Sequence, residues 1–280
     1  MHEDVIAGSS RTGRPDTPWE YRALIWNFAR RDLKSRFKGT ALGWAWSFVG
    51  PLATILIYSI VFSVFIRIQP PPFGNGRAGN YAVWLMTGLV TWQFIQQMLT
   101  RGMPTLLSNG ALLRKVYFPS FVPVVAVGLS VGIQSLIELG LVLVVLIAFV
   151  NVSWTWLLIP IWLAILWVTT TALSYSLAVA NVYGRDLAQI MAVVLQLLFF
   201  VSAVIFPISL VPEQIGPVPA RLLVELNPAA QFIIVGRELM YDLTVPDVQQ
   251  VAYLLFWAGV TVLFARWAYR RWGRDVGEAV

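Results

Sequence analysis

The sequence contains no cysteine and one histidine, His2, and only 12% of its 280 residues are charged. Without cysteine there are no disulfides, thiolate metal ligands or thiol nucleophiles, and a lone histidine in a polar stretch excludes a site built on paired imidazoles. A soluble domain usually has roughly a quarter charged residues. A chain this poor in charge lacks the polar residues that would cover a water-soluble fold.

Two motifs of nucleotide- and zinc-dependent enzymes are absent as well. The chain has neither the GxxxxGK[ST] loop that holds nucleotide phosphates nor the HExxH pair that binds catalytic zinc. We therefore expect no catalytic residue, no metal and no cofactor in this chain. If ATP drives its activity, a separate polypeptide must hydrolyse the ATP.

Hydrophobic residues dominate instead, at 58% of the chain, and they include 13 tryptophans and 16 phenylalanines. Aromatic residues are enriched where a membrane protein meets the two bilayer surfaces. Six stretches approach or exceed the roughly 20 apolar residues that a bilayer crossing needs. These stretches are 44–66, 81–100, 119–150, 154–180, 187–206 and 249–268. The pattern predicts an all-α membrane protein with a six-helix transmembrane domain over 41–270.

The basic residues are distributed unevenly over the two sides of this topology. Six crossings place 16 of the 20 Lys and Arg residues on the side of the two termini. The other side holds Arg67, Arg77, Arg221 and Arg237. Because Lys and Arg concentrate on cytoplasmic loops, we expect a plasma (inner) membrane protein with both termini in the cytoplasm. This distribution also argues against a nucleic-acid partner.

The N-terminal region divides into two parts. Residues 1–16 are polar, which predicts a disordered cytoplasmic tail and no cleavable signal peptide. Residues 17–40 open with Thr-Pro-Trp-Glu, a helix start signal, and predict an amphipathic helix lying in the lipid headgroup layer. Its candidate interfacial residues are Trp19, Trp26, Arg30, Arg31, Lys34 and Phe37. An ordinary basic flank of the first span is the alternative, and 271–280 form a second cytoplasmic tail.

The inner loop 103–117 has an apolar side and a basic side. Such a loop is suited to dock a cytoplasmic partner, although a solvated turn with extended cations is equally compatible with the composition. The candidate docking residues are Leu112, Leu113, Arg114, Lys115 and Tyr117.

The outer segment 207–240 is unusual for a loop. Six prolines fall between residues 207 and 248, yet 220–226 and 229–240 are strongly apolar and too short to span. Short apolar helices between prolines predict a re-entrant segment that dips into the membrane and closes a pathway. A simple loop packed over the bundle is the alternative.

One ionisable residue is expected inside the bilayer, Glu138 in the third span, with Gln134 one turn earlier on the same face. A buried membrane carboxylate is a functional candidate by default. A single carboxylate without a cationic or second acidic partner is a poor proton or sodium relay. A hydrogen-bonding role between helices, with the carboxyl protonated, is equally compatible with the sequence.

Four stretches carry a resemblance to a known family. They are RDLKSRFKGTALGWAWSFVGPL (31–52), LLRKVYFPSFVPV (112–124), VYGRDLAQIMAVVLQLLFFVSAVIFP (182–207) and NPAAQFIIVGREL (227–239). In this order they resemble the permease subunits of polysaccharide-exporting type-two ABC transporters, which include O-antigen, teichoic-acid and galactan permeases. The resemblance runs from about residue 20 to 270. It departs at Ser120-Phe121, where many relatives carry a charged residue.

The resemblance implies an assembly and a cargo. It implies a homodimer with two cytoplasmic ATP-binding subunits, which would bind ATP and magnesium, and outward movement of a lipid-linked polysaccharide through the membrane. It also implies that 19–38 is the interfacial helix, that 103–117 is the coupling loop and that 207–240 is the outer gate. Spans one and five would line the route, with aromatic rings on which sugar faces slide. The candidate pathway residues are Tyr58, Phe62, Phe65, Phe199, Phe200 and Phe206.

Three alternatives to this reading stay open at the level of the residues. A drug- or lipid-exporting permease would share the topology. A membrane glycosyltransferase or polymerase is disfavoured, because such enzymes keep acidic residues in the first outer loop and residues 67–80 contain none. The outer aromatic rings could also face lipid as an interfacial belt.

Overall fold

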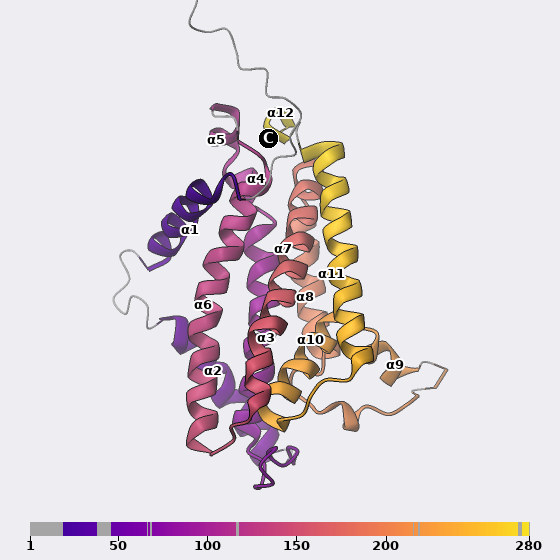
Figure 1. Ribbon diagram of the computed structural model, residues 1–280. Coiled ribbons are helices and arrows are strands. Elements are labelled where there is room, and N and C mark those ends of the chain that lie inside the picture. The colour runs from indigo at the N-terminus through magenta and orange to yellow at the C-terminus, as the bar shows by residue number, and fades with distance from the viewer. Residues whose placement is uncertain are drawn as a thin grey trace, which may run out of the picture.

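The computed structural model describes residues 19–37, 46–65, 67, 69–115, 118–214, 216–217, 219–273 and 276–279 (Figure 1). These residues form helices and connecting loops, with no β-strand among them. The predicted tail 1–16, the helix start at 17–18 and the docking candidate Tyr117 lie outside the described residues. The expected all-α architecture is confirmed for the part of the chain that is described.

The helical elements follow one another along the chain with short connections. In order they are α1 (Arg22–Phe37), α2 (Trp46–Ser59), π-helix η2 (Ile60–Phe65), α3 (Tyr81–Gly102), α4 (Thr105–Ser108), α5 (Gly110–Lys115), α6 (Phe121–Ala148), 3₁₀-helix η3 (Trp154–Leu158), α7 (Ile159–Tyr183), α8 (Leu187–Val201), 3₁₀-helix η4 (Ile208–Leu210), α9 (Ala220–Glu225), α10 (Pro228–Arg237), π-helix η5 (Glu238–Asp242), α11 (Val248–Ala268), π-helix η6 (Tyr269–Gly273) and α12 (Val276–Ala279).

Three helical stretches are long and apolar enough to cross a membrane by themselves. They are Phe121–Ala148, Trp154–Tyr183 and Val248–Gly273. Two shorter apolar stretches, Leu52–Phe62 and Leu187–Val201, correspond to the first and fifth predicted spans. The structure thus supports an integral membrane protein, while the full count of six spans stays a prediction.

Helix α3, the second predicted span, forms the centre of the bundle. It packs against α6, α7 and α10, and most of its side chains are buried. Asn80 caps its first turn, since the side chain accepts a hydrogen bond of 3.2 Å from the Val83 amide. A helix enclosed by other helices does not need an apolar lipid-facing surface, so α3 can carry buried threonines at 87 and 91.

The loop-rich end of the bundle is held by side chains that bind backbone carbonyls. Asn151 donates to the carbonyls of Met240 (3.2 Å) and Tyr241 (2.8 Å), and Thr155 donates to that of Leu239 (3.0 Å). These carbonyls belong to η5, where the π-helical register disturbs the ordinary hydrogen bonding. The loop after α6 therefore fixes the position of η5.

The opposite end carries the first and last described elements. Helix α1 lies beside α6, and α4, α5 and α12 gather above it (Figure 1). Ser120, at the start of α6, donates a 2.7 Å hydrogen bond to the Gly273 carbonyl and lies 2.9 Å from the Tyr175 hydroxyl. Ser120 thus ties α6 and α7 to the end of η6. This end is called the terminal end below, and the other the outer end.

Candidate functional site

Aromatic side chains from three helices meet near the outer end. Tyr58 stacks on Phe199 with ring centroids 5.9 Å apart, and Phe62 stacks on Tyr81 at 6.0 Å. Tyr58 and Phe62 are 6.0 Å apart, and Tyr81 lies 5.8 Å from Trp84. These five residues, here called the aromatic cluster, join α2 and η2, α3 and α8 into one continuous set of rings.

The aromatic cluster contains only part of the predicted pathway set. Tyr58, Phe62 and Phe199 belong to it, and Phe200 extends it with a centroid 5.3 Å from Phe199. Phe65 lies apart, with 74% of its surface exposed. Phe206 packs against the same main core as these rings and also near Ala203, beside the short helix α9. The structure brings four of the six candidates together.

Three aromatic residues of α3 beside these rings were not predicted. Tyr81 and Trp84 belong to the aromatic cluster, and Trp92 lies 5.6 Å from Phe199. The signal for them was present in the sequence, because positions 81, 84, 88 and 92 share one helical face. A search of this span for helical spacing would have identified the stripe.

Arg237 is a buried cation that contacts Trp84 of the aromatic cluster. Its side chain is 5% exposed, and its guanidinium carbon lies 3.6 Å from the centre of the Trp84 ring. One guanidinium nitrogen donates a 2.6 Å hydrogen bond to the Ala203 carbonyl, and another donates to that of Val204. The sequence predicted only an arginine on the outer face, so the burial of Arg237 is a finding of the structure.

The contacts of Arg237 explain two features of the surrounding backbone. Ala203 follows α8 with a positive φ of 51°, an unfavourable conformation for a residue with a side chain, and Arg237 binds its carbonyl. Gly88 faces the guanidinium so closely that an added Cβ would lie 2.1 Å from a guanidinium nitrogen. Arg237 thus joins α10, the end of α8 and α3 at one point.

Helix α10 is anchored within the bundle at its first turn and in its middle. Asn227 caps it by accepting a 3.0 Å hydrogen bond from the Ala229 amide, and donates one of 2.8 Å to Ser202. The indole of Trp162 on α7 donates a 3.1 Å hydrogen bond to the Phe232 carbonyl. The apolar half of the predicted re-entrant segment therefore packs inside the protein rather than over its surface.

Asp242 ends η5 outside the three long apolar helices. Burial raises the pKa of its carboxyl to about 6, an effect that nearby Arg237 reduces and Glu238 increases. The carboxyl therefore changes charge in the weakly acidic range.

Glu138 is buried, as expected for a residue inside the bundle. Gln134 donates a 2.9 Å hydrogen bond to its carboxyl, which confirms the proximity predicted from their spacing. Glu138 also lines a small cavity of about 30 Å³ with residues of α2 and α3, including Ile55 and Leu89. No cluster of three or more His, Cys, Asp or Glu side chains able to hold a metal occurs among the described residues.

The predicted docking residues lie at the terminal end. Leu112 and Leu113 are partly buried on α5, while Arg114 and Lys115 are exposed. The C-terminal helix α12 packs against α5, with Val276 fully buried. The last described residues of the chain therefore form one surface with the predicted coupling loop.

Helix α1 presents one face to α6 and another to the surroundings. Ile25 and Ala29 are buried against Phe118, Val122 and Ala126. Four of the predicted interfacial residues point outward, and they are Trp19, Trp26, Arg30 and Lys34. Arg31 is exposed and contacts α4, and the side chain of Phe37 lies outside the described set. The placement of α1 in a headgroup layer stays a prediction.

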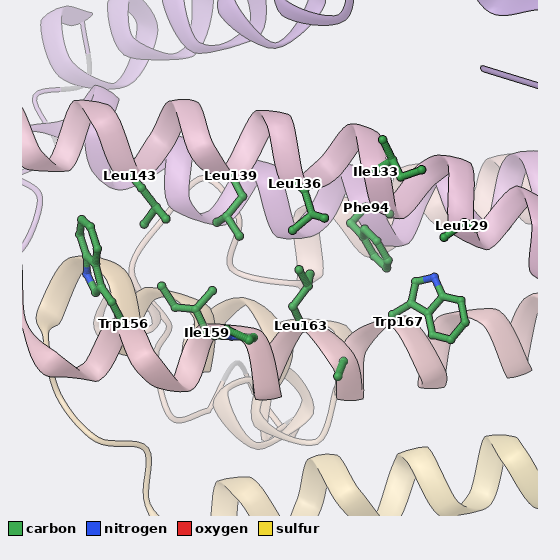
Figure 2. Close-up of a pocket in the computed structure, with 13 residues that line it drawn as sticks. Phe94, Leu129, Ile133, Leu136, Leu139, Leu143, Trp156, Ile159, Leu163 and Trp167 are labelled. Atoms are coloured by element: carbon green, nitrogen blue, oxygen red, sulfur yellow. The ribbon is translucent and has the colours of Figure 1, made fainter. Parts of the chain in front are cut away.

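An apolar groove of about 570 Å³ runs between α6 and α7. Figure 2 shows a row of leucine and isoleucine side chains from α6 facing Trp156 of η3 and Ile159, Leu163 and Trp167 of α7. The Trp167 indole is already engaged, since it donates a 2.8 Å hydrogen bond to the Gly128 carbonyl. The groove suits a hydrocarbon chain and is poorly suited to sugar hydroxyls.

Comparison with known proteins identifies close similarities along almost the whole chain. The chain is 28% identical over 255 residues to an O-antigen export system permease protein of Myxococcus xanthus, covering 89% of this chain and 94% of that protein. It is 26% identical over 236 residues to an O-antigen export system permease protein of Klebsiella pneumoniae, covering 83% of this chain and 85% of that protein.

Another similar protein is named for a different transported substance. The polysialic acid transport protein of Escherichia coli is 22% identical over 245 residues, covering 86% of this chain and 90% of that protein. The family described as ABC-2 type transporter matches residues 23–241, which include the aromatic cluster, Arg237 and the predicted docking loop. This chain is an integral membrane protein that belongs to the ABC-2 type transporter family.

Proposed function

We propose that this chain is the membrane-spanning permease subunit of an ATP-driven exporter that moves a lipid-linked polysaccharide out of the cytoplasm. The observation that carries the proposal is the similarity, over most of the chain, to permeases named for O-antigen and for polysialic acid, which are both polysaccharides. The chain would lie in the plasma membrane with its terminal end in the cytoplasm.

ATP hydrolysis is assigned to a separate subunit. The chain lacks a phosphate-binding loop, so ATP and magnesium would be bound by two cytoplasmic partner subunits. The surface formed by α4, α5 and α12 would receive them. Charge reversal at Arg114 and Lys115 should weaken association with the ATPase and reduce export, whereas unchanged association and export would assign this surface to solvent.

The aromatic cluster is the proposed contact for the sugar chain. Sugar rings have apolar C–H faces that pack on aromatic rings without fixed hydrogen bonds, which allows a polymer to slide. Tyr58, Phe62 and Phe199 are only partly buried, so they could contact a polymer at the surface between α2 and α8. Because a single bundle fills its own interior, a second copy would form the other wall of the pathway.

The test compares two sets of alanine variants at equal membrane levels. Combined replacement of Tyr58, Phe62 and Phe199 should reduce surface polysaccharide while assembly and basal ATPase activity persist. The control replaces Leu56, Ile60 and Val64, which are exposed on the same segment. The ring-retaining variants Tyr58→Phe and Phe62→Tyr should export normally. Normal export by the triple alanine variant would contradict the proposed pathway.

A lipid exporter is the second candidate, and the apolar groove between α6 and α7 is the observation that favours it. Deleting the gene distinguishes the two. Polysaccharide export predicts loss of surface polysaccharide with accumulation of the lipid-linked form inside the cell. A lipid exporter predicts an altered lipid distribution with normal surface polysaccharide.

A further inference from the structure

A polar pocket of about 470 Å³ lies at the terminal end, where α1, the end of α3, α4 and the start of α6 converge. It shares no residue with the aromatic cluster or the apolar groove, whereas Thr105 and Ser108 of its lining belong to α4 and so to the proposed ATPase surface. Part of its lining is polar and includes Arg31, Arg101 and Asn109. Another part is apolar, formed by Pro123, Ala126 and Val127 at the start of α6.

The charges in this pocket do not balance. The Asp32 carboxylate is engaged twice on one oxygen, because it pairs with Arg101 and accepts a 2.5 Å hydrogen bond from Ser130. Arg31 donates a 2.9 Å hydrogen bond to the neutral amide oxygen of Asn109, and its guanidinium lies over the Phe28 ring at 4.7 Å. Within the described residues, no carboxylate forms an ion pair with Arg31. Two guanidinium groups and one carboxylate leave one positive charge.

One hydrogen-bond donor of a pocket-lining arginine also lacks an acceptor within the described residues. The second terminal nitrogen of Arg101 is buried and has no hydrogen-bond partner within the described residues. A buried guanidinium N–H without an acceptor is costly, so a movement of the Arg101 side chain toward an acceptor in the pocket would be favourable. The hydroxyls of Thr105 and Ser108 already donate to helix carbonyls, which leaves the two arginines as the main donors.

We propose that this pocket binds the phosphate group of an anionic membrane phospholipid. A phosphate diester offers oxygen acceptors and one negative charge, which match the unfilled guanidinium donors and the net charge. The apolar part of the lining accommodates the glycerol and the first methylenes of the acyl chains. The pocket adjoins α1 and the start of α6, and α1 is the helix that the sequence predicts to lie in the headgroup layer.

The site predicts a specific lipid preference in the purified full-length chain. Native mass spectrometry in detergent should show one retained molecule of phosphatidylglycerol and weaker retention of phosphatidylcholine, whose choline group cancels the charge. Arg31→Gln should weaken phosphatidylglycerol binding about tenfold, the expected loss for one charge-assisted contact. Arg31 is exposed, so the substitution leaves the helix packing intact.

Arg22→Gln is the matched control, since it removes the same charge from an exposed position of the same helix that is outside the pocket and outside the predicted interfacial set. It should bind phosphatidylglycerol as the wild type does. Equal weakening in both variants would overturn the site in favour of general surface attraction. Equal retention of the two lipids would also overturn it, and binding of inorganic phosphate alone with the affinity of the lipid would overturn the lipid assignment.

Discussion

An arginine lies near each end of α3, and the two arginines are held by different kinds of contact. Near its first turns, Arg237 is buried, and it binds the carbonyls of Ala203 and Val204 and the face of Trp84. In its last turn, Arg101 is 21% exposed and pairs with Asp32 of α1. Backbone carbonyls and an aromatic ring surround the first arginine, and a partly exposed carboxylate pairs with the second.

This difference separates a rigid region from an adjustable one. A buried cation that loses its acceptors cannot be rescued by water, so Arg237 strongly favours one arrangement of α3, α8 and α10. A partly exposed ion pair is weak and can exchange partners with solvent or a ligand. We expect the outer end to resist local opening and the terminal end to respond to partners and lipid.

The largest effect is expected at Arg237. Arg237→Met keeps the volume but leaves two buried carbonyls without donors, which should destabilise the protein by about 3 kcal/mol. Thermal unfolding in detergent, followed by tryptophan fluorescence, measures this loss. Arg221→Met is the control, because Arg221 is 43% exposed and pairs with Glu225 one turn away. Similar stabilities of the two variants would contradict the rigid description of the outer end.

The second prediction tests the space around the same guanidinium. Gly88→Ala places a Cβ 2.1 Å from a guanidinium nitrogen of Arg237 and should cost about 1–3 kcal/mol through overpacking. Gly140→Ala on α6 meets no atom within 4 Å and should be neutral or slightly stabilising. Thermal unfolding of both variants makes the comparison. If Gly88→Ala is as stable as Gly140→Ala, Arg237 is free to move.

The third prediction concerns the ion pair at the terminal end. Asp32→Asn removes the charge that holds Arg101 and weakens the contact with Ser130, at a cost of about 1 kcal/mol. Hydrogen–deuterium exchange should increase over residues 22–37 while α10 stays protected. Asp186→Asn, at an exposed position before α8, is the control. Faster exchange at α10 would show that the two ends are not independent.

The smallest effect is the pH dependence of Asp242. Its pKa is raised from 3.8 to about 6 in the folded protein, so the folded state favours the protonated carboxyl. This stability is fully present below pH 4 and is lost as the pH rises through 6. Asp242→Asn mimics the protonated form and should become the more stable protein above pH 6, by about 1 kcal/mol or less because the carboxyl is partly solvated. Parallel pH profiles of the two proteins would exclude this shift.

Composition and periodicity were sufficient for the helices and for part of the site. The stretches predicted at 119–150, 154–180 and 249–268 correspond to the three long apolar helices, because a run of apolar residues near bilayer length has one stable form in lipid. The Gln134–Glu138 contact was predictable as well, since helical spacing alone brings positions four apart together. Tyr58 and Phe62 were found for the same reason.

The environment of each arginine was not predictable in this way. Arg101, Arg221 and Arg237 have the same side chain but different environments. Arg101 pairs with Asp32 of α1, Arg221 pairs with Glu225 of its own helix, and Arg237 is buried and binds backbone carbonyls.

By itself, the sequence determined that this is a helical membrane protein and where its three long apolar helices lie. Those properties depend on local composition and on a lipid solvent that every segment meets separately. Only the tertiary structure decided that Phe199 stacks on Tyr58 and that Arg237 binds the Ala203 carbonyl after α8. It also decided that Arg31 contacts the neutral side chain of Asn109. Such contacts join residues far apart in the chain, so they follow from packing rather than from any local pattern.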